Sequence, residues 1–166
     1  ERLLISSDGA MVQLTSGLWR EVKTTVIGEC HSQWDKTRGE IQTQTGSLSY
    51  FSRMSPAKEF TREALYEWDR RGGENAKEVV SVNDGAVWIQ SFIDYHCPQA
   101  TRILDFAHAA GYVAQVGKQV YSEDSPEFNH WYQKARHQLA NQPPHRTLAE
   151  LHLLQKQHDP DENNEE

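Results

Sequence analysis

The sequence contains few cysteines and no long apolar run. Only Cys30 and Cys97 occur among its 166 residues, and they do not form a Cys-x-x-Cys motif. This count excludes a disulfide framework and does not suggest a structural zinc site, so we expect buried or inert thiols. No segment approaches the roughly 18 to 20 apolar residues that a membrane span requires, and the N-terminus lacks the pattern of a signal peptide. We therefore expect a cytoplasmic protein with no membrane partner.

An excess of positive charge is also missing. The formal net charge is -7, whereas the neutralisation of nucleic-acid phosphates normally requires clustered Lys and Arg. This argues against a stand-alone nucleic-acid binder, although an acidic chain could still be the catalytic part of a protein whose basic parts lie elsewhere. The chain opens with Glu1 rather than Met and continues directly into an apolar run. We expect it to be a piece of a longer protein.

The apolar residues that are present suffice for one folded domain. They make up 37% of the chain and include five Trp, six Tyr and five Phe, while a mean hydropathy of -0.78 indicates a strongly polar surface. A chain of this length has room for one core and a tail. We expect a core over residues 1–122, a C-terminal helical segment over 123–157 and an acidic disordered tail over 158–166.

Three β-strands are expected in the first third of the chain. Residues 2–14, 17–31 and 41–54 are rich in Leu, Ile, Val and Thr, in partial alternation with polar residues. An Asp-Gly pair interrupts the first of these segments, which predicts a turn or bulge at Gly9. The short connections between the three strands indicate an antiparallel meander.

Helices and short strands alternate in the rest of the chain. Ser55 and Pro56 predict a helix cap followed by Pro at the first helical position, and apolar residues at helical spacing continue over residues 57–71. Further strands are expected at 77–82 and 101–106, and further helices at 87–95, 107–121, 125–142 and 147–157. The small residues of the helix at 107–121 would let it pack close to the sheet. This order predicts an α/β fold of the ribonuclease H-like type, with one mixed five-stranded sheet flanked by helices.

Two Asp-Gly-Ala triplets stand at the ends of apolar runs, in SSDGAMV and VSVNDGAVW. Asp8 falls in the first strand and Asp84 at the end of the fourth. If these strands are neighbours, the two carboxylates face one another where open α/β sheets bind ligands. Two carboxylates suit Mg²⁺ or Mn²⁺, and a pair of such ions can activate a water or a 3′ hydroxyl for displacement at phosphorus.

Ordinary turn chemistry gives a second interpretation of the same residues. Asp-Gly is a frequent turn pair, and an Asp before a helix is a good N-cap. For Asp84 the cap and the metal ligand are compatible roles. Asp105 and His108 also have two interpretations, because a His that follows a strand is often structural, with a nearby carboxylate as its hydrogen-bond partner.

Three blocks of the sequence resemble one family. SSDGAMVQL, GLWREVKTTVIGE and the stretch from VSVNDGAVW to LDFAHAAGYV follow one another over roughly residues 3 to 140. They are similar to the catalytic domain of bacterial insertion-sequence transposases of the Mutator-like DDE type. The resemblance implies that Asp8 and Asp84 are the catalytic, metal-binding residues. It also implies a supporting role for Asp105 and His108, although Ala107 replaces the aromatic residue that usually precedes the His.

The resemblance does not extend to the family's third acid. That residue is a Glu on a late helix, in a block like Gly-Ser-Gly-x-Val-Glu, and no such block occurs here. Glu123, Glu127 and Glu150 are available, but Glu127 suits the first turn of a helix, where the dipole favours a negative charge. The third acid is therefore unknown, and we expect it outside the chain. The chain alone is not expected to cut DNA.

The resemblance implies DNA strand cleavage and strand transfer at transposon ends. Mg²⁺ or Mn²⁺ would be the cofactor, DNA the partner, and the bacterial cytoplasm the location, with an oligomer expected for the full-length protein. Two other functions stay open. One is a non-catalytic remnant that keeps the fold and acts as an interaction module, and the other is a different ribonuclease H-like nuclease.

Overall fold

The computed structural model describes residues 2–158. Apart from His158, the expected acidic tail lies outside the described residues. The chain divides into two compact units, Glu1–Asp105 and Phe106–Glu166, which we call the sheet unit and the helical unit. The division falls earlier than the expected boundary after residue 122, and that boundary stays a prediction.

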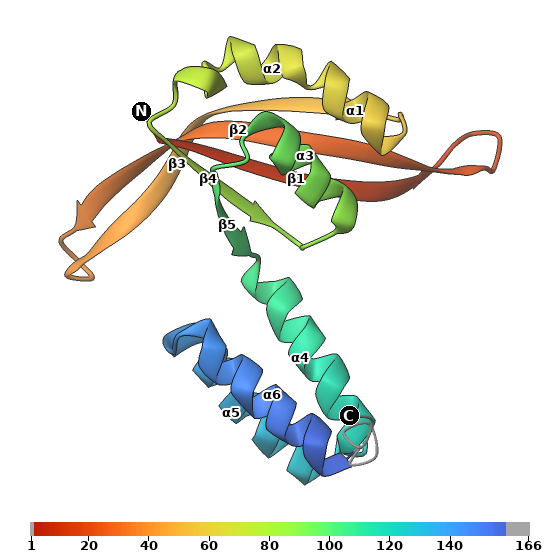
Figure 1. Ribbon diagram of the computed structural model, residues 1–166, viewed down its shortest axis with the longest axis vertical. Coiled ribbons are helices and arrows are strands. Elements are labelled where there is room, and N and C mark those ends of the chain that lie inside the picture. The colour runs from red at the N-terminus through yellow and green to blue at the C-terminus, as the bar shows by residue number, and fades with distance from the viewer. Residues whose placement is uncertain (1, 159–166) are drawn as a thin grey trace, which may run out of the picture. The chain divides into compact units, whose positions relative to one another are not determined.

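The sheet unit contains a five-stranded mixed sheet. Its order is β3-β2-β1-β4-β5, with antiparallel pairing from β1 to β2 and β2 to β3, and parallel pairing from β1 to β4 and β4 to β5 (Figure 1). This confirms an α/β fold with one mixed five-stranded sheet, and the order is compatible with a ribonuclease H-like arrangement. The strands are β1 (Arg2–Gln13), β2 (Trp19–Asp35), β3 (Glu40–Arg53), β4 (Glu78–Asn83) and β5 (Thr101–Leu104).

The predicted turn or bulge at Gly9 is wrong. β1 pairs with β2 without interruption from Leu3 opposite Glu29 to Gln13 opposite Trp19. Gly9 therefore stays in an extended strand, where a Cβ atom would lie 2.2 Å from Oε1 of the Glu21 side chain. The irregularity in this meander lies in the β2–β3 pair instead, near Ser47, whose φ is 48°.

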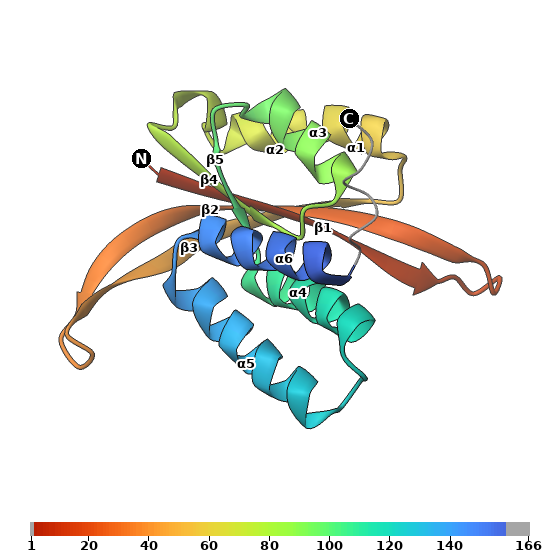
Figure 2. The same ribbon diagram turned by 60° about the horizontal axis from the view of Figure 1, so that its bottom comes forward.

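Three α-helices of the sheet unit cover one face of the sheet (Figure 2). The helix predicted over residues 57–71 is divided in two, because Ala64 separates α1 from α2. The predicted cap at Ser55 is also wrong. Pro56 takes the N-cap position in an extended conformation without a side-chain cap, and the Ser55 hydroxyl lies 3.2 Å from Glu63. The helices are α1 (Ala57–Glu63), α2 (Leu65–Arg70) and α3 (Val87–His96), with a 3-10 turn, η1, at Gly73–Asn75.

The core lies between these helices and the sheet. Alternate residues of β1 and β4 point into it, so Leu3, Ile5 and Val79 are almost fully buried. Burial of each large apolar side chain contributes about 1.5 to 3 kcal/mol, which fixes the register of the two strands. The alternation places Asp8 on the opposite face of the sheet, and Asp84 directly follows the last residue of β4. The helices contribute Phe60, Ala64, Trp68, Ile89, Phe92, Ile93 and Cys97 to the same core.

The helical unit consists of α4 (Phe106–Val120), α5 (Pro126–Asn141) and α6 (Pro144–His158). The helix α5 begins as the Ser-Pro pair predicts, because the Ser125 hydroxyl accepts a hydrogen bond of 3.1 Å from the Phe128 amide. Gly117 of α4 lies against α5, and a Cβ atom there would come within 2.2 Å of the Trp131 ring. No helix among the described residues combines the length and the apolar character needed to cross a bilayer.

Candidate metal centre at the strand ends

Asp8 and Asp84 both lie at the carboxyl end of the parallel part of the sheet. Asp8 is an exposed residue of β1, and Asp84 directly follows β4. Their strands are neighbours, as the sequence interpretation requires, although the two residues are separated by 76 positions. The pairing of β1 with β4 ends at Ile5 opposite Ser81, so these two strands bring the two aspartates to the same end of the sheet.

The residue register between β1 and β4 continues beyond their last backbone pair. The Ser6 hydroxyl donates a 2.6 Å hydrogen bond to the Val82 carbonyl, and the Ser7 amide donates a 2.6 Å bond to Oδ1 of Asn83. Both bonds keep the offset of 76 positions that the strands have at Ile5 and Ser81. One further step along each strand places Asp8 opposite Asp84.

Asp105 extends this row to a third strand. β4 pairs with β5 up to Asn83 opposite Leu104, and the Asp105 amide donates a 2.8 Å hydrogen bond to the Asn83 carbonyl. Asp105 therefore directly follows β5, at the position next to Asp84. The continued registers place Asp8, Asp84 and Asp105 in one row across three adjacent parallel strands.

A buried polar cluster supports this row, and the sequence analysis did not single it out. Asn83 is 6% exposed, and its side chain joins β4 to β1 through the Ser7 amide and to Ser81 through a 2.5 Å bond. The Ser7 hydroxyl lies 3.0 Å from that of Thr25 on β2. The sequence feature that could have revealed this cluster is the polar residue before each aspartate, in Ser-Asp-Gly and Asn-Asp-Gly. A buried polar residue at a strand end indicates a hydrogen bond that the strands need there.

Local backbone amides orient the two carboxylates. Oδ1 of Asp84 accepts a 2.8 Å hydrogen bond from the Ala86 amide, which forms a turn just before α3. Asp84 is therefore not the N-cap residue itself, because Ala86 holds that position without a side-chain cap. Oδ1 of Asp8 accepts a 2.7 Å bond from the Gly9 amide. The turn interpretation of Asp84 thus holds, and it is compatible with a ligand role.

The donor set fits a hard divalent cation, but it is small. Carboxylate oxygens with water in the remaining positions suit Mg²⁺ and Mn²⁺. Among residues 2–158, no three His, Cys, Asp or Glu side chains come close enough together to form a metal site. The row of aspartates therefore offers at most a pair of close ligands as it stands. A bound substrate phosphate or a further acid would have to complete the coordination.

A small cavity lies beside the ends of β4 and β5. Its volume is about 210 Å³, and Ser81, Asn83 and Leu104 contribute to its wall. The charged group in its wall is Arg102, which donates hydrogen bonds to Gln90 and Asp94. Asp84 is not among the residues that line this cavity, although its neighbour Gly85 is. The candidate centre is therefore an open edge of the sheet rather than a pocket.

The remaining candidate residues belong to the helical unit. His108 is exposed near the start of α4, two positions after Phe106. Glu127 lies in the first turn of α5, as predicted. Glu123 pairs with Lys118, and Glu150 lies 3.8 Å from Lys134. Each of these three glutamates thus has a structural position of its own, and the third acid stays unidentified.

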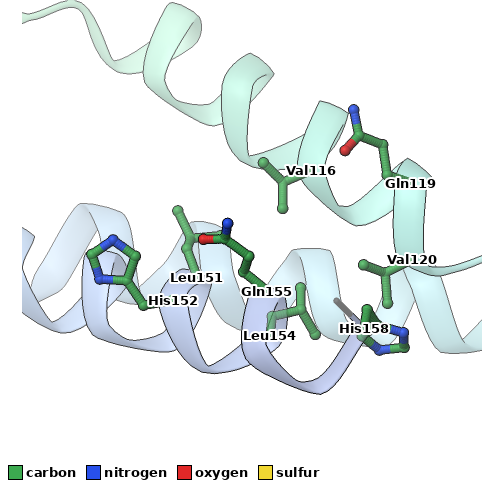
Figure 3. A pocket seen from close by; sticks show the side chains of 8 residues that line it. All are labelled: Val116, Gln119, Val120, Leu151, His152, Leu154, Gln155 and His158. Carbon is green, nitrogen blue, oxygen red and sulfur yellow. The ribbon is translucent and has the colours of Figure 1, made fainter. Parts of the chain in front are cut away.

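The helical unit has a cavity of about 440 Å³ between α4 and α6 (Figure 3). No carboxylate lies among its lining residues. Two histidines of α6 line it, but they are six positions apart, and a helix places such residues on different faces. The cavity therefore does not resemble a metal site. Its lining consists of Val116, Gln119, Val120, Leu151, His152, Leu154, Gln155 and His158.

The thiols and the buried histidine of the sheet unit have structural roles. Cys30 and Cys97 are both buried and free, as expected, and burial raises the pKa of Cys97 to about 11. A thiol with such a pKa is a poor nucleophile at neutral pH. Burial also lowers the pKa of His96, whose Nε2 lies 2.9 Å from the Thr61 carbonyl. These groups belong to the core and do not contribute to the candidate centre.

Comparison with models of known protein families gives no match for this chain. Comparison with curated protein sequences gives none either. The case for a function therefore depends on the residues and geometry described above.

Proposed function

We propose that the sheet unit is a ribonuclease H-like catalytic core of a DDE transposase, which cleaves and transfers DNA strands with two divalent ions. The observation that carries this proposal is the row of Asp8, Asp84 and Asp105 across β1, β4 and β5. Turn chemistry alone explains each Asp separately, but it does not explain why the registers of three adjacent strands carry an Asp at the same level, within β1 and directly after β4 and β5.

Each residue of the row has a proposed task. Asp8 and Asp84 bind Mg²⁺ or Mn²⁺, and the ions would supply an activated oxygen nucleophile and stabilise the leaving oxygen at phosphorus. Asn83 holds the end of β4 to β1 at Ser7 and so sets the separation of the two carboxylates. Asp105 and His108 act as supporting residues that orient ligands or position the substrate.

The proposed metal site lacks one acidic ligand. The resemblance implies a third acid on a late helix, and neither the sequence blocks nor the described contacts identify one. We therefore propose that this chain binds a divalent ion weakly and does not cleave DNA alone. Its DNA partner would be positioned by parts that lie outside the sheet unit, because the chain as a whole is acidic.

Titration of the chain with Mn²⁺, followed by the paramagnetic broadening of backbone amide signals, tests the metal site. We expect selective broadening near Gly9 and Gly85, and its loss in both Asp8→Asn and Asp84→Asn. Asp35→Asn is the matched control, because Asp35 also accepts a 2.8 Å bond from a backbone amide two positions later, that of Thr37. Broadening that survives in Asp8→Asn and Asp84→Asn would contradict the proposed ligands.

The same preparation separates the two alternatives. Nicking of supercoiled DNA by the chain alone, dependent on Asp8 and Asp84, would favour a nuclease that needs no further acid. An absence of Mn²⁺ binding, with a normal fold, would favour a non-catalytic interaction module. The small number of close ligands among residues 2–158 is the observation that keeps this second function in consideration.

A further inference from the structure

The outer ends of β2 and β3 form a two-stranded ribbon that continues beyond β1 (Figure 1, orange). β1 pairs with β2 only as far as Leu3 opposite Glu29, whereas β2 and β3 remain paired as far as Asp35 opposite Glu40. We call residues 30–35 and 40–45 the ribbon. An isolated two-stranded hairpin is marginally stable in water, and three or more strands are normally needed. The ribbon would therefore gain stability from an additional strand.

The outer strand of the ribbon lacks the usual protection of an edge. β3 is the last strand of the sheet, and residues 41–52 contain neither a charged residue nor a proline. Natural edge strands are commonly blunted by charges, prolines or bulges. The bulge near Ser47 lies inward of the ribbon, so it leaves the stretch from Glu40 to Thr45 regular. This stretch can accept another strand along its free backbone edge.

Two exposed apolar side chains mark the tip of the ribbon. Trp34 and Ile41 are directly opposite one another on the two strands, and they are 57% and 69% exposed. Cross-strand pairs of this kind stabilise a sheet when a neighbouring strand covers them. An additional strand beside β3 would cover part of this exposed pair.

The sequence of β3 at this edge is complementary to itself. In an antiparallel pair of two copies with Thr43 opposite Thr43, each Gln42 lies opposite Gln44 of the other copy. Each Ile41 then lies opposite Thr45, and Glu40, the one charged residue of the stretch, lies opposite Gly46, which has no side chain.

The rows of side chains across such a four-stranded sheet also match in chemistry. Within one ribbon the register already pairs Gln33 with Gln42, and Ser32 with Thr43. Self-pairing joins Ser32 and Thr43 of the two copies into a row of hydroxyls on one face. On the other face it forms a row of three amides, Gln33, Gln42 and Gln44, that ends at His31. Hydroxyl pairs and amide pairs are favourable cross-strand neighbours. No row places like charges of the two copies directly opposite one another.

We propose that a second copy of this chain pairs with the edge of β3 over residues 40–46, with Thr43 on the two-fold axis. The two-fold symmetry of such a dimer pairs the β3 edges of both copies with each other, so neither copy keeps a free β3 edge. DNA is a less suitable occupant, because the ribbon and its turn carry Asp35 and Glu40 beside Lys36 and Arg38 and so have no net positive charge. Pairing of the ribbons requires neither metal nor DNA, so its test is separate from that of the proposed function.

The mass of the chain in solution, measured by sedimentation over a range of concentrations, tests the dimer. We expect a species of twice 19.1 kDa for the wild type. We expect Thr43→Lys to weaken association at least about tenfold, because it places two like charges opposite one another, equivalent to about 1.4 kcal/mol. Thr43→Ser, which keeps the hydroxyl and adds no charge, is the matched control and should weaken association much less than Thr43→Lys does.

A mixture of Thr43→Lys with Thr43→Glu tests whether Thr43 of one copy lies opposite Thr43 of the other. Each variant alone should associate at least about tenfold more weakly than the wild type, with unchanged secondary structure, and the mixture should recover the dimer because opposite charges then meet. A monomeric wild type at every accessible concentration would overturn the proposal. So would dimerisation of Thr43→Lys with wild-type strength, or assembly of the wild type into species larger than a dimer.

Discussion

At the scale of single residues, Asn83 joins the end of β4 to the middle of β1 through its side chain. Its amide accepts from the Ser7 backbone where the parallel ladder has already ended, and it is almost completely buried. The side chain of Asn83 therefore replaces a backbone hydrogen bond between β1 and β4, one position before Asp8 and Asp84. The distance between Asp8 and Asp84 depends on this contact, which makes Asn83 a positioning residue in the proposed centre.

Asn83→Ala should lower both the stability of the protein and its affinity for Mn²⁺. The substitution leaves the Ser7 amide without its partner, at a cost of about 1 to 3 kcal/mol in the free energy of unfolding. Urea denaturation measures the first effect and Mn²⁺ titration the second. Asn75→Ala, at an exposed position of η1, is the control and should change neither. A loss of stability with unchanged Mn²⁺ affinity would show that Asn83 is structural only.

His96 makes the stability of the sheet unit depend on pH. Its pKa in the folded protein is lowered by burial, so the unfolded chain binds a proton more readily than the folded chain does. The neutral form is present in both states above the ordinary His value, and no stability is lost there. As the pH falls below about 6.5, the unfolded state gains the proton first and the folded state is destabilised.

We expect His96→Phe to reduce this pH dependence. The free energy of unfolding of the wild type should fall by up to about 1.4 kcal/mol per pH unit below about pH 6.5 from this group. Phe retains the ring contacts that His96 makes with Phe92, whose centroid is 4.5 Å away, and with Trp68. Urea denaturation over this pH range gives the slopes. Equal slopes in the two proteins would exclude His96 as the cause.

At the scale of secondary-structure elements, two Ser-Pro pairs with the same sequence signal behave differently. Ser125 caps α5 through the Phe128 amide, whereas Ser55 does not cap α1 because Pro56 itself stands at the cap position. Sequence alone predicted both helices but could not distinguish the two starts. The difference arises in the preceding chain, since Ser55 follows only two positions after the end of β3.

Ser125→Ala should therefore destabilise the helical unit by about 1 kcal/mol, the usual cost of a lost N-cap. Ser55→Ala is the matched control in the same chain, with an expected change within about 0.5 kcal/mol. Urea denaturation followed by helical circular dichroism compares the two variants. Equal losses, or a larger loss for Ser55→Ala, would contradict the assignment of the caps.

At the scale of the whole molecule, the order and type of the elements could be predicted from the sequence. Partial apolar alternation predicted β1, β2 and β3, short apolar runs predicted β4 and β5, and helical spacing predicted the helices. The sequence analysis assumed that β1 and β4 are neighbours, as in a ribonuclease H-like order, and the structure pairs these two strands. These features depend on patterns that repeat along the chain, and such patterns are visible in one sequence.

Features that depend on packing between distant residues were not predictable in this way. The extended conformation at Gly9 depends on pairing with β2, and the role of Asn83 depends on where the β1–β4 ladder ends. The division of the chain after Asp105 follows from the packing of α4 with α5, where Gly117 meets Trp131. None of these contacts has a periodic signal in the sequence.

The most direct test of the central claim is anomalous diffraction from crystals of the chain soaked in Mn²⁺. We predict a peak within direct coordination distance of the carboxylates of Asp8 and Asp84. The peak should disappear in Asp84→Asn crystals and remain in those of Asp35→Asn. Crystals that contain Mn²⁺ at other positions but show no density between Asp8 and Asp84 would contradict the account.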